Sequence, residues 1–78
     1  REAVARILQD IDPVLRFHDF RMTRGKNHRN LFFDVVAPFR FRLTEVEICD
    51  RIQQALTALD PRLFAIITLD RAAGEETP

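Results

Sequence analysis

Ligand-capable polar side chains lie inside three apolar stretches of this sequence. His18 lies in RFHDFRM, Asp34 in LFFDVVA, and Asp70 ends LFAIITLD. A carboxylate within FFDVV is costly to bury unless it is paired or bound to a metal. One imidazole nitrogen and two carboxylate oxygens suit Zn²⁺ or a similar divalent ion. The residue types therefore make His18, Asp34 and Asp70 candidate metal ligands. The alternative is structural: His18 packs in a sheet and Asp34 pairs with an arginine.

The three stretches have the patterns of strands. Period-two alternation predicts a strand over about residues 14–23 and puts four side chains on one side, namely Arg16, His18, Phe20 and Met22. Asp19 falls on the opposite side, so we do not expect it to join a site with His18. The polar, glycine-bearing segment 24–30 predicts a hairpin turn. Two further apolar runs predict strands over 31–37 and 63–70.

Helical spacing marks the two remaining elements. The first, over about residues 1–11, has one apolar face made of Val4, Ile7, Leu8 and Ile11. Thr44 and Glu47 match a capping box, which predicts a second helix running to about Leu59. Asp-Pro pairs follow both helices and end them, because the residue before proline disfavours the α region.

The predicted order is αββαβ, an α+β fold with a three-stranded sheet and both helices on one face. The second and third strands are apolar at both parities, as in Leu31, Phe32 and Phe33. An antiparallel sheet with one wet face should instead alternate apolar and polar residues. We therefore expect the second face to be buried against another copy of the chain, in a homodimer formed through the sheet face or its margin.

Length and composition narrow the class of protein. The 78 residues allow one domain, 1–78, with a core over about 12–71 and a polar tail over 72–78. Cys49 is the only cysteine, which favours a reducing, cytosolic setting. No apolar run reaches the roughly 20 residues that span a bilayer, so we expect this piece to be soluble. Because it starts at Arg1 without an initiator methionine, we expect it to be cut from a longer protein.

The sequence carries no catalytic signature, so we do not expect an enzyme. An acylphosphatase-like hydrolase would have this size but needs a glycine-rich loop, and the chain has only Gly25 and Gly74. Twelve basic residues balance twelve acidic ones, which argues against general nucleic-acid binding. A free-standing ferredoxin-like module for a small ligand or RNA, bound through the basic turn RGKNHRN, stays open as the alternative.

Four segments resemble a known family in order and spacing: VLRFHDFRM, NLFFDVVAPF, LTEVEICDRIQQAL and DPRLFAIITLDR. They are similar to the cytoplasmic C-terminal dimerisation domain of cation diffusion facilitator transporters, also called cation efflux proteins. The similarity covers about residues 12–71. Its most telling piece is His-Asp-Phe-Arg, close to the His-Asp-Leu-Arg that commonly opens this domain.

The resemblance implies a metallochaperone-like αββαβ domain at the cytoplasmic face of the cell membrane. An upstream transmembrane domain would exchange divalent metal for protons, and the dimeric C-terminal domain would bind zinc and regulate transport. His18 matches the histidine of the opening motif, and Asp70 matches the aspartate that ends the third strand. Asp34 and Thr68 stand where zinc-transporting members often have histidines, so the site would bind zinc less tightly or favour a harder ion such as Mn²⁺ or Fe²⁺.

Overall fold

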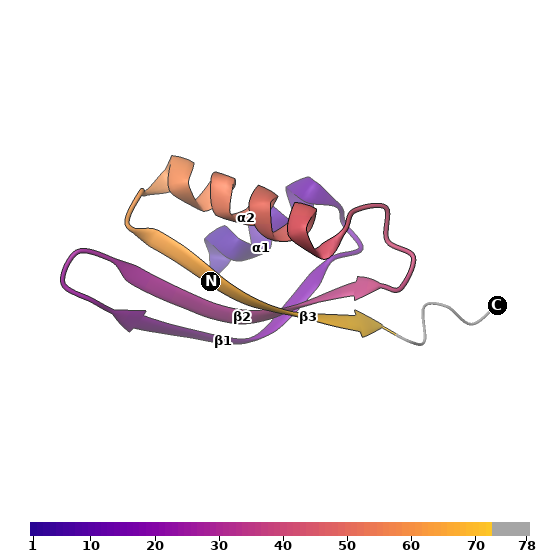
Figure 1. The fold of residues 1–78 in the computed structure, drawn as a ribbon, viewed down its shortest axis with the longest axis horizontal. Helices are drawn as coiled ribbons and strands as arrows, with labels where there is room; N and C mark the ends of the chain where they lie inside the picture. The colour runs from indigo at the N-terminus through magenta and orange to yellow at the C-terminus, as the bar shows by residue number, and fades with distance from the viewer. Residues whose placement is uncertain (73–78) are drawn as a thin grey trace.

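The computed structural model describes residues 1–72, and residues 73–78 of the expected tail lie outside the described residues. Five elements follow in the order α1 (Glu2–Ile11), β1 (Arg16–Arg24), β2 (Arg29–Pro38), α2 (Glu45–Leu59) and β3 (Leu63–Ala72). The strands lie side by side in the order β1-β2-β3, with β1 antiparallel and β3 parallel to β2. Both helices cover the same face of this sheet (Figure 1). The predicted α+β fold is confirmed.

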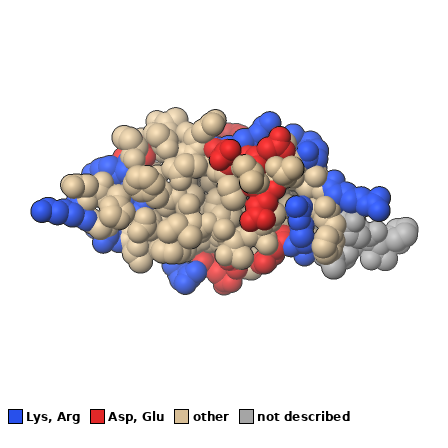
Figure 2. Space-filling model, in the orientation of Figure 1, with Lys and Arg blue, Asp and Glu red and all other residues tan. Residues whose placement is uncertain are grey.

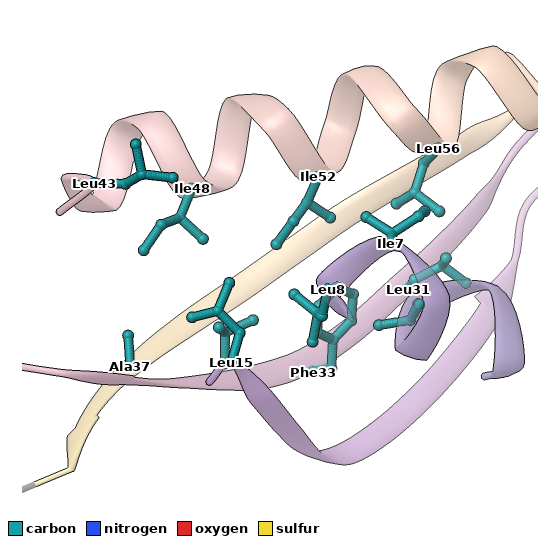
Figure 3. Close-up of a cluster of buried hydrophobic side chains, with 12 residues drawn as sticks. Ile7, Leu8, Leu15, Leu31, Phe33, Ala37, Leu43, Ile48, Ile52 and Leu56 are labelled. Carbon is teal, nitrogen blue, oxygen red and sulfur yellow. The ribbon is translucent and has the colours of Figure 1, made fainter. Parts of the chain in front are cut away.

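The core lies between the helices and one face of the sheet. Each helix contributes one apolar stripe, Val4, Ile7 and Leu8 from α1 and Ile48, Ile52 and Leu56 from α2. These stripes pack against alternate residues of β2, which are Leu31, Phe33, Val35 and Ala37 (Figure 3). Full burial of a side chain of this size contributes about 1.5–3 kcal/mol. The central strand β2 therefore fixes which face of the sheet is covered.

Polar side chains fix the first turn of α2 and the start of β3. The capping box is present: Thr44 accepts a hydrogen bond from the Glu47 amide, and the Glu47 carboxylate accepts one from the Thr44 amide. Further along α2, the Gln53 side chain donates to the Leu63 carbonyl at 2.9 Å and accepts from the Ala65 amide at 2.8 Å. Gln53 thereby ties α2 to the first residues of the edge strand β3.

A β-bulge interrupts the predicted alternation of β1. His18 pairs with Asp34, but the next paired residues are Arg21 and Phe32, so β1 holds one residue more than β2 across this interval. Asp19 lies at φ 58°, the left-handed region that few residues other than glycine adopt. The expectation that Phe20 and Met22 share a face with His18 is therefore wrong. Phe20 instead turns toward the core and stacks on Phe33.

The other face of the sheet carries no helix. Phe64 and Ile66 of β3 lie on this open face and keep 46% and 47% of their surface exposed. On β2, Phe32 lies beside Ile66, and Val36 lies further along the strand, beyond Asp34, where it pairs with Asp70. The strands are also longer than expected, since β2 starts at Arg29 and β3 continues to Ala72. The turn between β1 and β2 is consequently confined to residues 25–28.

Removing the cap of α2 tests how much this helix end stabilises the fold. Thr44→Ala leaves the Glu47 amide without its side-chain acceptor, so we expect a loss of about 1 kcal/mol. For a domain of this size that loss corresponds to a fall in Tm of about 4–8 °C, measured by circular dichroism. The matched variant Thr44→Ser keeps the hydroxyl and should melt close to the wild type. Equal losses in both variants would contradict a capping role.

Candidate metal centre

Strand register brings the candidate residues together on the open face of the sheet. His18 of β1 pairs with Asp34 of β2, and Asp34 pairs in turn with Thr68 of β3. Asp70 lies in the neighbouring row, where it pairs with Val36. Residues that are far apart in the sequence thus form one surface patch, and each strand contributes at least one of them.

The imidazole of His18 lies at the centre of this patch. Its Nδ1 is 3.1 Å from Asp19 Oδ2 and 3.5 Å from Asp34 Oδ2. On the other side of the ring, Nε2 is 3.6 Å from Asp70 Oδ2. The side chain of Asp34 is 22% exposed and that of His18 is 51% exposed, so water reaches the ring while the central carboxylate is largely covered. The structure therefore places His18, Asp34 and Asp70 in one cluster.

Asp19 also belongs to this cluster, which the alternation of β1 does not predict. The bulge adds one residue after His18 and turns the Asp19 carboxylate back toward Nδ1. Aspartate is one of the few residues that tolerate the left-handed region, because its short polar side chain can hydrogen-bond locally. The only sequence signal for this bulge is a weak one: a residue that tolerates the left-handed region directly follows His18.

Three side chains offer atoms close enough to bind one ion. One ligand atom each from His18, Asp19 and Asp34 lies within 4.8 Å of the others. The ligand atoms of a tetrahedral zinc lie about 3.3 Å apart, given bonds of about 2.0 Å, so small side-chain rotations would suffice. Asp70 faces the opposite ring nitrogen and would join the same ion only if the ring turned. A nitrogen with several carboxylate oxygens is a donor set that fits zinc and also harder divalent ions.

Electrostatics make this cluster a place for a cation. Partial burial, together with the nearby Asp19 and Asp70 carboxylates, raises the pKa of Asp34 above its ordinary value of 3.8. A hydrogen bond with His18 instead lowers the pKa of Asp19. In Figure 2, some of the acidic side chains lie at the lower edge of the molecule, on the side of the open sheet face, and a larger group lies higher, on the side of the helices. A divalent cation would offset the repulsion that raises the pKa of Asp34.

Cys49 is not part of this centre. It lies on α2, on the helical side of the sheet, and burial raises the pKa of its thiol above the ordinary 9.0. The neighbouring Glu45 and Asp50 carboxylates raise it further. A thiol with a raised pKa is a poor nucleophile and a poor metal ligand at neutral pH.

Comparison with known proteins gives matches at the level of structure. The sequence matches no protein-family model and no curated protein. A solved structure of CzrB, described as a candidate zinc transporter, superposes with a TM-score of 0.66 at 25% identity, covering 92% of this chain and 95% of that one. The zinc form of CzrB gives a TM-score of 0.67 at 28% identity, over 99% of this chain and 92% of that one.

The likeness to CzrB supports the C-terminal domain of a cation diffusion facilitator. The match extends over nearly the whole chain, which agrees with the resemblance seen in the four sequence segments. The chain is therefore related to a domain of a metal cation transporter, because both matched structures come from a protein described as a candidate zinc transporter. Within residues 1–72, no helix has the length and apolar character needed to cross a membrane.

The raised pKa of Asp34 gives a testable pH dependence. A raised carboxyl pKa means that the folded state holds the proton more tightly than the unfolded chain, so Asp34 costs stability as pH rises from 3.8 through its raised value. We expect Asp34→Asn to raise the Tm of the metal-free domain at pH 7 by a few degrees. The gain should shrink as the pH falls toward 4, because a larger fraction of the wild-type carboxyl is then protonated.

The control for this experiment is Asp50→Asn, which changes an exposed carboxylate on α2 away from the cluster. Thermal melts of both variants between pH 4 and pH 8 separate a local effect from a general change in net charge. A lower Tm of Asp34→Asn at pH 7, or a gain equal to that of Asp50→Asn, would contradict the repulsion described for Asp34.

Proposed function

We propose that this chain is the metal-binding regulatory domain of a divalent cation efflux transporter. The observation that carries the proposal is the imidazole of His18 surrounded by Asp19, Asp34 and Asp70 on the open sheet face. Its support from outside the chain is the likeness to CzrB, which is described as a candidate zinc transporter. The domain would bind metal and pass that signal on, without catalysing a reaction.

In this proposal the full protein has a transmembrane domain upstream of residue 1, which exports zinc or a similar ion by exchange with protons. Residues 1–78 form a single domain at the cytoplasmic face of the membrane. His18, Asp34 and Asp70 are the ligands that the sequence indicates, and Asp19 is added because of its position 3.1 Å from the imidazole. Bound metal would supply positive charge that holds the carboxylates together.

The donor set bears on the choice of metal. Thr68 pairs with Asp34 across the sheet, in the same row as His18. A histidine at this position would add a second nitrogen ligand. With one nitrogen and several carboxylate oxygens, the site should bind zinc more weakly than a histidine-rich site does, and Mn²⁺ or Fe²⁺ relatively better. Zinc is the first ion to test because CzrB also exists in a zinc form.

Zinc binding is expected to depend on the clustered residues. In a calorimetric titration at pH 7.5, His18→Ala and Asp70→Ala should bind zinc about tenfold more weakly or worse, and Asp19→Asn should be weakened similarly. The matched control is His28→Ala, which removes the only other histidine, in the exposed turn between β1 and β2. Unchanged binding in both His18→Ala and Asp70→Ala would remove the proposed site.

A variant designed to bind zinc more tightly complements these weakened variants. Thr68→His adds an imidazole directly beside Asp34 in the sheet register and should tighten zinc binding. Thr23→His is its control, because Thr23 lies near the hairpin and pairs with Asn30. Equal tightening in the two variants would indicate histidine binding at the surface in general.

The same face is the proposed homodimer interface. Phe64 and Ile66 are exposed and Ile66 pairs with Phe32, which gives an apolar surface that a second copy could cover. The acidic cluster borders these residues, so two facing copies would bring their carboxylates near one another. Metal bound in the clusters would reduce this repulsion, which would link metal binding to association and give the transporter a signal.

Dimerisation can be measured by sedimentation velocity with and without zinc. We expect a dimer at micromolar concentration that tightens with zinc, and an Ile66→Lys variant whose dissociation constant rises about tenfold or more. Val46→Lys is the matched control, because Val46 is exposed on α2 and not on the sheet face. A wild-type chain that stays monomeric with and without zinc would contradict the proposed interface.

A further inference from the structure

A second charged feature lies at the hairpin end of the sheet, where β1 ends and β2 begins. We call it the basic tip, defined as Arg24, Lys26, Arg29 and Arg62. Arg24 and Arg29 face each other as the last residue pair of the β1–β2 hairpin, and Lys26 lies in the turn between them. Arg62 comes from the α2–β3 connection, where its carbonyl accepts the Arg29 amide at 2.8 Å. Figure 2 shows blue side chains gathered at this pointed end of the molecule.

The basic tip holds more positive charge than its surroundings balance. Like charges directly opposite each other across two strands destabilise a sheet, and Arg24 and Arg29 are such a pair. The nearby Asp60 carboxylate accepts hydrogen bonds from Arg62 Nε at 3.1 Å and from Arg62 Nη2 at 2.9 Å. This pairing lowers the pKa of Asp60 to about 2. The ion pairs found among residues 1–72 include none with Arg24, Lys26 or Arg29.

These side chains surround a hollow that is already formed. It measures about 220 Å³ and is lined by the basic tip together with Gly25, Asn27 and His28. The Gly25 amide donates to the His28 carbonyl at 2.7 Å and closes the turn. The His28 ring packs so closely over Gly25 that a Cβ atom at this position would clash with it. The His28 ring also packs against the Phe64 ring in an edge-to-face arrangement, with the ring centroids 5.9 Å apart. The turn is thus held in one shape by contacts that do not use its positive charges.

The chemistry of the hollow indicates a phosphate ligand. Arginine presents a planar fork of N–H donors that matches phosphate oxygens in two parallel hydrogen bonds. Arg24, Arg29 and Arg62 approach the hollow from two chain segments, and Lys26 adds a fourth cation. We propose that the basic tip binds a phosphate group, carried either by a small soluble anion or by a lipid headgroup. The bound anion would offset the repulsion between Arg24 and Arg29.

This site is independent of the metal centre. Arg24 is six residues beyond His18 along β1, which corresponds to roughly 20 Å of strand. The two sites carry opposite charge and would take ligands of opposite sign. A variant of one site should therefore leave the other intact, which keeps failure of this proposal distinguishable from failure of the proposed metal-binding function.

The soluble arm of the test uses the 78-residue chain with inorganic phosphate and pyrophosphate, against chloride at the same ionic strength. We expect both anions to bind in calorimetry and to raise the Tm of the wild-type chain. Arg29→Gln should melt above the wild type without ligand, because the like-charge pair is removed, and should bind phosphate about tenfold or more weakly. The matched control is Arg51→Gln, which changes an exposed arginine on α2 and should retain the wild-type affinity.

The lipid arm uses co-sedimentation with vesicles of phosphatidylglycerol mixed with phosphatidylcholine, and with pure phosphatidylcholine vesicles as the neutral comparison. Binding to the anionic vesicles that Arg29→Gln loses and Arg51→Gln keeps would assign the phosphate to a lipid. Binding in the soluble arm alone would assign it to a free anion. In either case His18→Ala should bind the phosphate ligand as the wild type does, and Arg29→Gln should bind zinc as the wild type does.

The proposal is overturned if neither phosphate, pyrophosphate nor anionic vesicles bind above the chloride and neutral-vesicle controls. It is equally overturned if Arg51→Gln weakens binding as much as Arg29→Gln, since the effect would then come from net charge alone. If the chain bound a single-stranded RNA but neither phosphate source, the basic tip would be a nucleic-acid site. That result would also contradict the proposal.

Discussion

The packing of both helices on one face of the sheet is the constraint on which the rest of this domain depends. The central strand β2 buries Leu31, Phe33, Val35 and Ala37 beneath α1 and α2. The alternate residues of the same strand must then point to the other side, and Asp34 is among them. Among residues 1–72, no further helix or strand covers that side. Its polar cluster and its exposed aromatic and branched residues therefore share one surface.

Local patterns predict most of this fold. The capping box at Thr44, the apolar stripes of both helices and the Asp-Pro pairs at their ends act within a few residues, so element order and layers follow from them. The bulge at Asp19 does not follow, because period-two alternation counts residues and one added residue reverses every position after it. The partnership of His18, Asp34 and Asp70 agrees with their residue types, but their distances depend on strand register, which is set by the tertiary packing.

The two charged features of the domain differ in how they are held together. At the acidic cluster, neighbouring carboxylates divide their protons unequally, with the pKa of Asp34 raised and that of Asp19 lowered. At the basic tip, a closed turn and backbone hydrogen bonds hold arginines near each other although their charges repel. In both cases packing elsewhere in the fold stabilises an arrangement of charge that electrostatics alone opposes. Such arrangements favour ligands of the opposite charge.

The contact between Gln53 and β3 has a consequence for how copies of this domain can assemble. β3 is an edge strand, and an exposed edge invites strands of other molecules to add to the sheet. Gln53 occupies the Leu63 carbonyl and the Ala65 amide, which an added strand would otherwise use. Addition of a strand is therefore hindered at the start of β3. In the proposed homodimer the copies would meet through the open sheet face and would leave this contact intact.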